Sequence, residues 1–283
     1  MIQFFLGKFL RMSVVMIGAI LIMFLLMHAI PGNPWSNYSD TVRILRLEAD
    51  EPVLNELTHR FGLDLPLWRQ FTRYVIGDFN EDGSFFCGAI CGNLGPSTAR
   101  RGRTVINVLF APPLGMTFWK SEFGYSLRLV LLGSIFTIGL GIPLGILSAI
   151  KPKSAVSRII SVAMAGLSAV PNFVLGLLAV IVAALWLRII PVVPYWNNPY
   201  HWLIPAAVLS AMPTASVARV TRASLMNILT EDYVRTARAK GLVEVRVMLV
   251  HVLRNSLAPI ITFLGPTLME MFAGLVIIEN LYG

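Results

Sequence analysis

The chain carries few residues that could take part in chemistry, and their spacing matches no catalytic pattern. It contains no G-x-x-x-x-G-K-[ST] phosphate-binding loop, H-E-x-x-H motif, G-x-S-x-G nucleophile turn or paired Cys/His zinc spacing. Scattered histidines near apolar segments are more often structural hydrogen bonders than metal ligands, and four are present: His28, His59, His201 and His251. We therefore expect no catalytic, cofactor-binding or metal-binding site in this chain.

Cys87 and Cys91 are the only cysteines, and their C-x-x-x-C spacing could close a small disulfide loop. The pair is too sparse for a metal site without further ligands, and two free thiols are the alternative. The predicted membrane topology places both cysteines outside the cytoplasm, in a compartment that permits disulfides. On this ground the sequence favours a disulfide.

Glu270 is an ionisable residue inside a long apolar segment. A carboxylate at membrane depth is costly, so it is first taken as a functional residue, here one that lines a translocation pathway. Two alternatives stay open: the side chain is neutral, or it pairs with a partner subunit across a helix bundle.

The stretch EDYVRTARAKG has the pattern of a short helix with a sharp end. The acidic Glu231 and Asp232 suit the positive end of a helix dipole, and Arg238 and Lys240 suit its negative end. Gly241 follows as a residue able to take a positive φ.

The flanks of this stretch extend the prediction. We expect Thr230 to cap the start of the helix, and a second, largely apolar helix over residues 243–253 to lead back to the membrane. The small residues Ala237, Ala239 and Gly241 leave room for close approach by another surface. A solvated connector between two spans is the alternative.

Membrane-spanning helices must position these residues, because the chain is too apolar for a soluble domain of its length. Of its 283 residues 56% are hydrophobic and only 13% are charged, and its mean hydropathy is +0.71. About 20 apolar residues cross a bilayer as a helix. Five stretches qualify, at residues 12–30, 129–150, 159–187, 202–218 and 256–278. The predicted fold class is an all-α polytopic membrane protein with five transmembrane helices.

The third stretch is longer than a bilayer requires. As a helix it would reach about 43 Å, against a hydrocarbon core of about 30 Å. It must tilt, bend or protrude, and Pro171 is the natural place for a bend. The fourth stretch is short and holds Pro205 and Pro213, so its pattern is the weakest of the five.

Basic residues set the orientation, because Lys and Arg near span ends are retained on the cytoplasmic side. They cluster before the first stretch, between the second and third, and between the fourth and fifth. The N-terminus is therefore predicted inside. A cleaved signal peptide is the alternative for the first stretch, but its apolar run is long and no small-x-small site follows. These loops explain much of the net charge of +8, so no nucleic-acid partner is implied.

Three regions follow from this topology: a first helix over residues 1–30, an extracytoplasmic loop region over residues 31–127, and a core membrane domain over residues 128–283. The loop region is too long for a simple connector, and the helical spacing of apolar residues over residues 41–77 predicts short helices at the membrane surface. Its basic stretch ARRGR is interpreted as a solvated face or a lipid-headgroup contact. The core domain carries a cytoplasmic loop over residues 221–255.

The stretch DYVRTARAKG resembles the cytoplasmic loop signature of the inner-membrane permease subunits of ATP-binding-cassette importers, in the dipeptide, oligopeptide and nickel branch. In that signature Ala stands four residues before Gly, matched here by Ala237 and Gly241. Nearly the whole chain resembles the family, through FLLMHAIPGNPW, FGLDLPLWRQFTRYV, GNLGPSTARRGRTVINVLF, AVPNFVLGLLAVIVAALWLRIIPV and HVLRNSLAPIITFLGP.

The resemblance implies the type I importer permease fold in the cytoplasmic membrane of a prokaryote. The implied partners are a homologous second permease subunit, two ATPase subunits that bind ATP and magnesium, an extracytoplasmic solute-binding protein and membrane lipids. Peptides are the implied solute, with nickel or another small solute as the alternative. The loop helix of such permeases docks on the ATPase, which implies coupling roles for Glu231, Asp232, Tyr233, Arg235, Thr236, Ala237, Arg238, Ala239, Lys240 and Gly241.

The sequence departs from the family pattern in three places. Val243 stands where a Ser or Thr usually caps the second helix, so that start is expected to fray or to be capped by other means. Glu270 stands where the family is usually small, aromatic or apolar. The stretch IENLYG usually leads to a sixth span, whereas this chain stops at Gly283, and we expect that it is not fully active alone.

Two functions from other classes are weaker fits. A secondary transporter or channel usually shows several buried ionisable residues, whereas here only Glu270 qualifies and the loop helix would be unexplained. A membrane-embedded enzyme would need a convergent catalytic set. We therefore expect a permease subunit that forms half of an ATP-driven import pathway.

Overall fold

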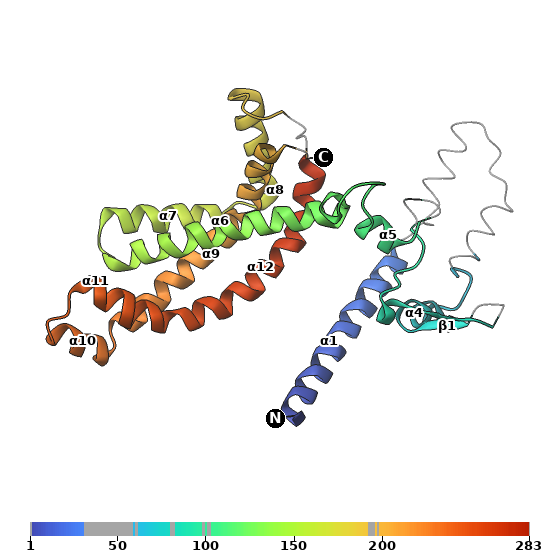
Figure 1. Ribbon diagram of the computed structural model, residues 1–283, viewed down its shortest axis with the longest axis horizontal. Coiled ribbons are helices and arrows are strands. Elements are labelled where there is room, and N and C mark those ends of the chain that lie inside the picture. The colour runs from blue at the N-terminus through green and yellow to red at the C-terminus, as the bar shows by residue number, and fades with distance from the viewer. Residues whose placement is uncertain are drawn as a thin grey trace. The chain divides into compact units, whose positions relative to one another are not determined.

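The computed structural model describes residues 2–30, 59, 62–79, 83–97, 100, 103–191, 196 and 198–282, and divides the chain into two compact units, Met1–Ala111 and Pro112–Gly283 (Figure 1). Among the described residues, four helices are long and apolar enough to cross a membrane, and a bent pair of shorter helices makes a fifth candidate span. The prediction of a helical polytopic membrane protein is confirmed. The short helices expected over residues 41–77 lie largely outside the described residues, as does most of the ARRGR stretch.

The first unit begins with α1 (Ile2–Ala29), an apolar helix with no buried side chain among those described. Such a helix needs lipid or another protein around it. Its last turns contact α4 (Leu67–Val75), where the rings of Phe24 and Phe71 lie 5.4 Å apart. His28 Nε2 also lies 3.0 Å from Gln70 Oε1. These contacts place α4 at the end of the span.

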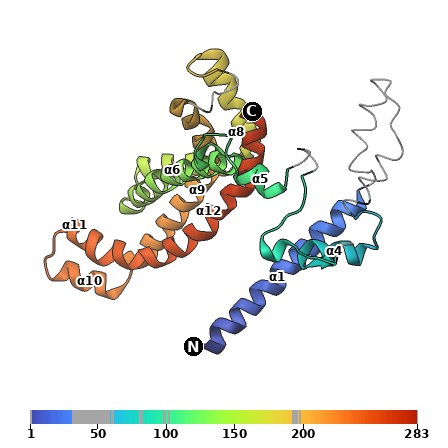
Figure 2. The same cartoon turned by 45° about the vertical axis from the view of Figure 1, so that its right-hand side comes forward.

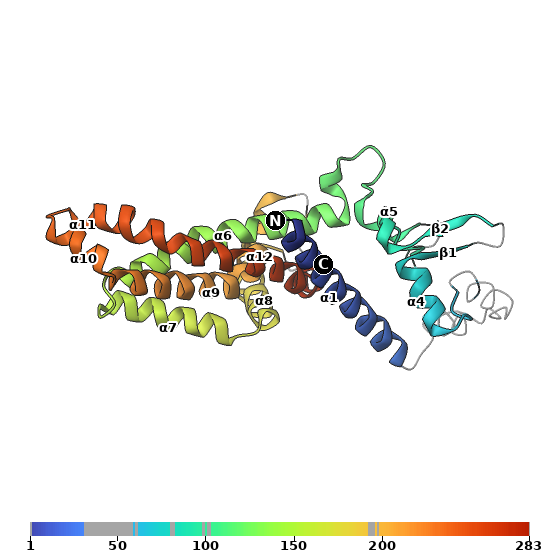
Figure 3. The ribbon, with the colours of Figure 1, turned by 90° about the horizontal axis from the view of Figure 1, so that it is seen from below.

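A β-hairpin follows α4, a feature that the sequence did not predict. β1 (Gly77–Phe79) pairs antiparallel with β2 (Phe85–Cys87) (Figure 3). The rings of the opposed residues Phe79 and Phe85 lie 5.2 Å apart. A 3₁₀ turn, η1 (Ala89–Cys91), comes next, and a disulfide joins Cys87 to Cys91 across a Cα–Cα distance of 5.9 Å. The short helix α5 (Val105–Phe110) ends the unit.

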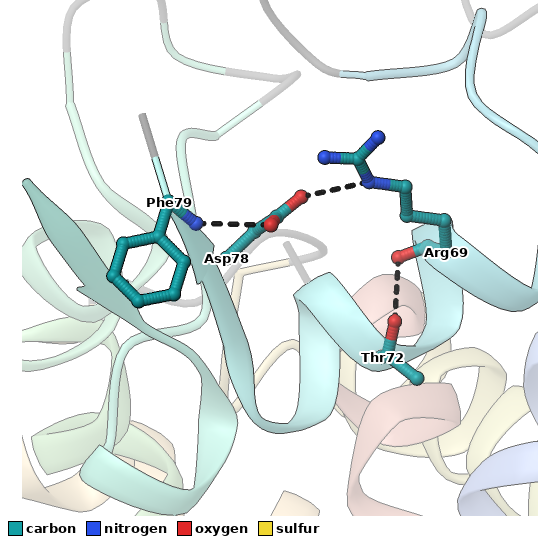
Figure 4. A network of polar contacts seen from close by, with 4 residues as sticks. All are labelled: Arg69, Thr72, Asp78 and Phe79. Atoms are coloured by element: carbon teal, nitrogen blue, oxygen red, sulfur yellow. Dashed lines mark hydrogen bonds and ion pairs between the residues drawn. The ribbon is translucent and has the colours of Figure 1, made fainter. Parts of the chain in front are cut away.

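Asp78 ties the hairpin to α4 (Figure 4). Its carboxylate accepts hydrogen bonds from the Phe79 N–H at 2.9 Å and from Arg69 Nε at 3.2 Å. The Phe79 amide first, and then the Arg69 side chain, hold the pKa of Asp78 below its ordinary value. The Thr72 hydroxyl donates to the Arg69 carbonyl at 3.1 Å, within the same helix.

The second unit is a bundle of four long helices, α6 (Glu122–Ile150), α7 (Ala155–Ala169), α9 (Leu203–Leu229) and α12 (Arg254–Tyr282), which lie side by side in Figure 3. α9 packs against each of the other three. Serine caps fix two of the helix starts, because each hydroxyl satisfies a free N–H of the first turn. Ser121 accepts from the Gly124 N–H at 3.0 Å, and Ser154 from the Ser157 N–H at 3.1 Å.

Glycines on α6 let α9 approach closely. A Cβ atom at Gly145 would lie 2.5 Å from Thr221 Cβ, and one at Gly141 would lie 3.0 Å from the Thr214 carbonyl oxygen. Small residues at helix interfaces are typical of membrane bundles, where backbone proximity increases van der Waals contact. Larger apolar side chains fill the core between α6, α9 and α12, among them Leu129, Leu209, Met271 and Ile278.

The third predicted span is two helices with a sharp bend. α7 ends at Ala169, and α8 (Asn172–Val180) continues into a π-helical segment, η3 (Ile181–Trp186). The two parts meet at 100°. Pro171 occupies the N-cap of α8, and Val170 before it is extended, as a residue preceding proline prefers. The bend expected at Pro171 is confirmed.

The fourth span is longer than predicted. A 3₁₀ turn, η4 (Pro199–Trp202), leads into α9, which continues to Leu229 rather than ending near residue 218. Pro205 lies in the first turn, where N–H groups have no partner within the helix in any case. Pro213 is tolerated inside the helix, as prolines often are in membrane spans. The prediction of a short fourth span was therefore wrong.

Candidate functional site

The predicted loop helix is α10 (Asp232–Ala239), which lies with α11 (Glu244–Arg246) at one end of the bundle (Figure 2). α11 runs through a π-helical segment, η5 (Val247–Leu253), directly into α12, so Glu244–Tyr282 forms one continuous helix. The predicted second helix is present and starts after Val243, but the prediction that it ends near residue 253 was wrong. No proline or glycine interrupts this region before Pro259.

The N-cap of α10 is Glu231, one residue after the expected cap Thr230. Thr230 has helical φ and ψ and ends α9, and its hydroxyl donates to the Asn227 carbonyl at 2.7 Å. Glu231 is extended and occupies the N-cap, although its side chain makes no capping hydrogen bond. Thr230 cannot cap α10 because a cap residue must leave the helical conformation. The Thr230 prediction was wrong for this reason.

The end of α10 is a complete Schellman turn. Gly241 has φ of +75°, the conformation expected for it. Its N–H donates to the Arg238 carbonyl at 2.9 Å, and the Leu242 N–H donates to the Ala237 carbonyl at 3.4 Å. These two bonds satisfy two of the otherwise free carbonyls at the end of the helix. The sharp end of α10 therefore comes from its own sequence.

One face of α10 is buried within this chain. Val234 is fully buried and Ala237 is 5% exposed, so the expectation that Ala237 leaves room for another surface was wrong. Together they form a cluster with the ends of α6, α9 and the last helix, whose other buried members are Ala149, Leu225, Val247 and Val252. Ala237 is small because its own chain packs on it. The cluster fixes α10 to the bundle.

The opposite face of α10 is exposed and carries both signs of charge. Its exposed residues are Glu231, Asp232, Tyr233, Arg235, Thr236, Arg238, Ala239, Lys240 and Gly241. Arg235 Nη1 lies 3.6 Å from Asp232 Oδ1, and Asn255 Nδ2 donates to the Tyr233 hydroxyl at 3.0 Å. The structure thus brings all ten predicted loop residues together, with only Ala237 turned inward.

Arg238 and Glu244 hold α10 against the next helix. Arg238 Nη2 and Nε donate to the two carboxylate oxygens of Glu244 at 2.7 and 3.1 Å. Two-point pairs between guanidinium and carboxylate fix orientation as well as distance. Val243 is the N-cap of α11 and makes no side-chain cap, as its type requires. The ion pair joins Glu244, in the first turn of α11, to α10, but it accepts from no backbone N–H and so does not replace a cap hydroxyl.

Glu270 lies apart from this loop, on α12, and its side chain is exposed. Met269 and Glu270 share the outer side of the helix, whereas Met271 is buried in the core. A carboxylate on the outer side of a spanning helix needs a partner chain or water beside it. The structure does not bring Glu270 together with the loop residues.

Sequence reasoning missed two polar contacts between spans. Arg222 Nη1 donates to the hydroxyls of Ser157 and Ser161, both at 2.7 Å. Ser126 Oγ donates to Glu279 Oε1 at 2.6 Å. The sequence offered one signal for each contact. Ser157 and Ser161 are four residues apart and so share one helix face, and Glu279 is an acidic residue near the end of a span.

As a whole, the loop is a helix with a buried apolar face, a fixed orientation and an exposed, charged outer face. Among the described residues, no group of three or more His, Cys, Asp and Glu side chains could hold a metal ion.

Comparison with known proteins gives consistent matches. Residues 141–283 match the family described as "Binding-protein-dependent transport system inner membrane component". The chain is 29% identical over 283 residues to the dipeptide transport system permease protein DppB of Bacillus subtilis (strain 168), covering 100% of this chain and 82% of that protein. It is 31% identical over 262 residues to the glutathione transport system permease protein GsiC of Escherichia coli (strain K12), covering 92% and 76%.

Proposed function

Because the chain belongs to the family of inner membrane components of binding-protein-dependent transport systems, we propose that it forms half of a pathway for short peptides, driven by ATPases docked on α10. Membership of this family makes it a multi-pass protein of a bacterial inner membrane and a permease subunit rather than an enzyme. The identity of the solute, the individual partners and the orientation in the membrane go beyond family membership and are proposed here.

The observation that carries the proposal is the build of α10. Its inward face, Val234 and Ala237, is locked into the bundle, while its outward face is free for a partner. A helix fixed on one side moves its attached spans when a partner displaces it on the other. The cluster behind α10 includes residues from α6, α9 and the last helix. A push on α10 would therefore reach three spans at once.

Peptides are proposed as the solute because of the names of the relatives. The relatives from Bacillus subtilis and Escherichia coli are named as dipeptide and glutathione permeases, and both kinds of solute contain peptide bonds. A second, homologous permease subunit would complete the pathway, and an extracytoplasmic binding protein would deliver the peptide. ATP and magnesium would bind to the two ATPase subunits.

Glu270 is proposed to face this pathway. Its side chain is exposed on α12, and a bare carboxylate against lipid would be costly. A water-filled path between two permease subunits would remove that cost, and it would also let the carboxylate attract a peptide ammonium group. Pairing with a cation of the second permease subunit remains the competing role.

The proposed orientation places the N-terminus and the α10 loop in the cytoplasm. The disulfide hairpin would then lie outside, in the region proposed over residues 31–127. The basic residues near the α10 loop support this orientation, since Lys and Arg are retained inside. Arg235, Arg238 and Lys240 all lie in that loop.

The test is co-purification of the ATPase subunits with variants of the exposed face of α10. Ala239→Glu and Lys240→Glu add negative charge to that face without touching the buried residues. We expect both variants to lose ATPase subunits and peptide-stimulated ATP hydrolysis, while the permease itself stays folded.

Lys153→Glu is the matched control. It makes the same charge reversal on an exposed lysine of the turn between α6 and α7, outside α10 and on the same proposed side of the membrane. This variant is expected to keep its ATPases. If Lys240→Glu retained ATPase subunits and coupled hydrolysis as well as Lys153→Glu does, α10 would be a solvated connector and the proposal would fail.

A further inference from the structure

The bent third span is held to α9 by a polar contact at its cytoplasmic half. Arg222 of α9 points one guanidinium nitrogen, Nη1, at the hydroxyls of Ser157 and Ser161 on α7, with both distances at 2.7 Å. Ser157 is fully buried and Arg222 is half-buried. In the part of the chain that the structure describes, no carboxylate forms an ion pair with Arg222.

The donors and acceptors of this contact are fully matched. Ser157 Oγ gives its proton to the Ser148 carbonyl of α6 at 2.8 Å, and Ser161 Oγ gives its proton to the Ser157 carbonyl at 2.8 Å. Each hydroxyl therefore keeps a lone pair for the guanidinium. Charged hydrogen bonds of this kind are stronger than neutral ones. Arg222 thus joins α6, α7 and α9 at one point.

Arg222 lies next to the part of α9 that packs against α10. One turn further on, Leu225 is fully buried in the cluster that holds α10. No residue of α7 belongs to that cluster. A separate small cluster, in which Met164 meets Ala215 and Ala218, is the apolar contact between α7 and α9. Arg222 is therefore a polar link between α7 and the part of α9 that packs against α10.

We propose that Arg222 is a positioning residue that makes α7 follow α9 when α10 is displaced, so that the bend at Pro171 moves with the ATPases. The proposal rests on the proposed function, because it takes α10 as the site where force enters. Two serines one turn apart give the guanidinium two anchors, so α7 can neither slide nor rotate past α9 without breaking a charged hydrogen bond.

The experiment measures the distance between α7 and α9 in the complete transporter. Spin labels are placed at Val162 on α7 and Met226 on α9, both of which are exposed. Distances are recorded without nucleotide and with the ATPases trapped by ATP and vanadate. In the wild type we expect one narrow distribution that is the same in both states. In Arg222→Gln we expect a broad distribution that differs between the states.

A second readout is the amount of peptide moved per ATP hydrolysed. In Arg222→Gln it is expected to fall by roughly tenfold, within the range of coupling between distant sites, with ATPase binding unchanged. Arg222→Lys keeps the charge and is expected to restore part of the ratio. Arg219→Gln, one turn earlier, is the control, because Arg219 is exposed and donates to Ser216 of its own helix at 3.3 Å.

Two results would overturn the proposal: a distance distribution in Arg222→Gln that matches wild type, or a wild-type distance that changes between the states. Should Arg222→Gln fail to assemble, Ser161→Ala removes one anchor without removing the charge and is judged by the same distances. If the wild-type ATPases do not bind, the proposed function fails instead. In that case, the α7–α9 distance distributions of wild type and Arg222→Gln without nucleotide are sufficient to test whether Arg222 holds α7 to α9.

Discussion

The Ser126 hydroxyl donates a 2.6 Å hydrogen bond to Glu279 Oε1, and so joins the first turns of α6 to the last turns of α12. The two residues are 153 positions apart in the sequence. Arg222 makes the corresponding contact among α6, α7 and α9 nearer the α10 end. Polar contacts thus hold the bundle at both ends, with apolar packing between them.

Removing the Ser126 hydroxyl is predicted to destabilise the protein. Ser126→Ala leaves the half-buried Glu279 carboxylate without this donor, which typically costs about 1–3 kcal/mol. Thermal unfolding in detergent measures the loss. Ser126→Thr, which keeps a hydroxyl, should lie close to wild type. Ser168→Ala is the control, because Ser168 donates to the Met164 carbonyl of its own helix. Equal melting temperatures for Ser126→Ala and Ser168→Ala would contradict the prediction.

Gly241→Ala is predicted to loosen the end of α10. The Cβ would meet no atom within 4 Å, so the cost comes from the backbone φ of +75° alone. For an L-residue this conformation costs about 1–2 kcal/mol. Hydrogen exchange of the amides of α10 should therefore speed up. Gly166→Ala on α7 also meets open space but has ordinary helical φ, and it should stabilise the protein slightly. Similar effects of the two changes would rule out the backbone explanation.

The hairpin is predicted to lose stability in acid through Asp78. Its pKa in the folded state is lowered by the Phe79 amide and then by Arg69, so its contribution is complete above the ordinary value of 3.8. The contribution is lost as the pH falls through the lowered value. The hairpin amides of Asp78→Asn should therefore exchange hydrogen faster than those of wild type at neutral pH. The difference in exchange rate should vanish in acid.

Arg69→Gln separates the two causes of the lowered pKa. It removes the guanidinium donor but leaves the Phe79 amide bonded to Asp78, so the pH dependence should lie between wild type and Asp78→Asn. Hydrogen exchange, corrected for the intrinsic effect of pH on amide rates, gives the measurement. A pH dependence in Asp78→Asn as large as in wild type would exclude Asp78 as the source.

Local sequence signals predicted the features that depend on one residue or one stretch. The spans follow from apolar length, the bend from Pro171, and the sharp end of α10 from Gly241. Each of these is governed by backbone chemistry that neighbours modify only slightly. The family could also be inferred from one local stretch, because DYVRTARAKG contains the loop signature itself.

Features that depend on distant partners could not be predicted in this way. α9 continues past Pro213 because Thr221 and Leu225 find buried places against α6 and the α10 cluster. Its longer course displaces the cap of α10 from Thr230 to Glu231. The buried position of Ala237 and the contact of Arg222 with Ser157 likewise require the packed bundle. No periodicity within one helix contains that information.

The unbroken helix Glu244–Tyr282 has a mechanical consequence. Its 39 residues span about 58 Å. It begins beside α10, where Glu244 pairs with Arg238, and ends where the Tyr282 hydroxyl donates to the Gly176 carbonyl of α8. Such an element acts as a lever: a tilt of about 5° moves one end by about 5 Å relative to the other. A small displacement of Arg238 would thus be transmitted along this helix across the full thickness of the membrane.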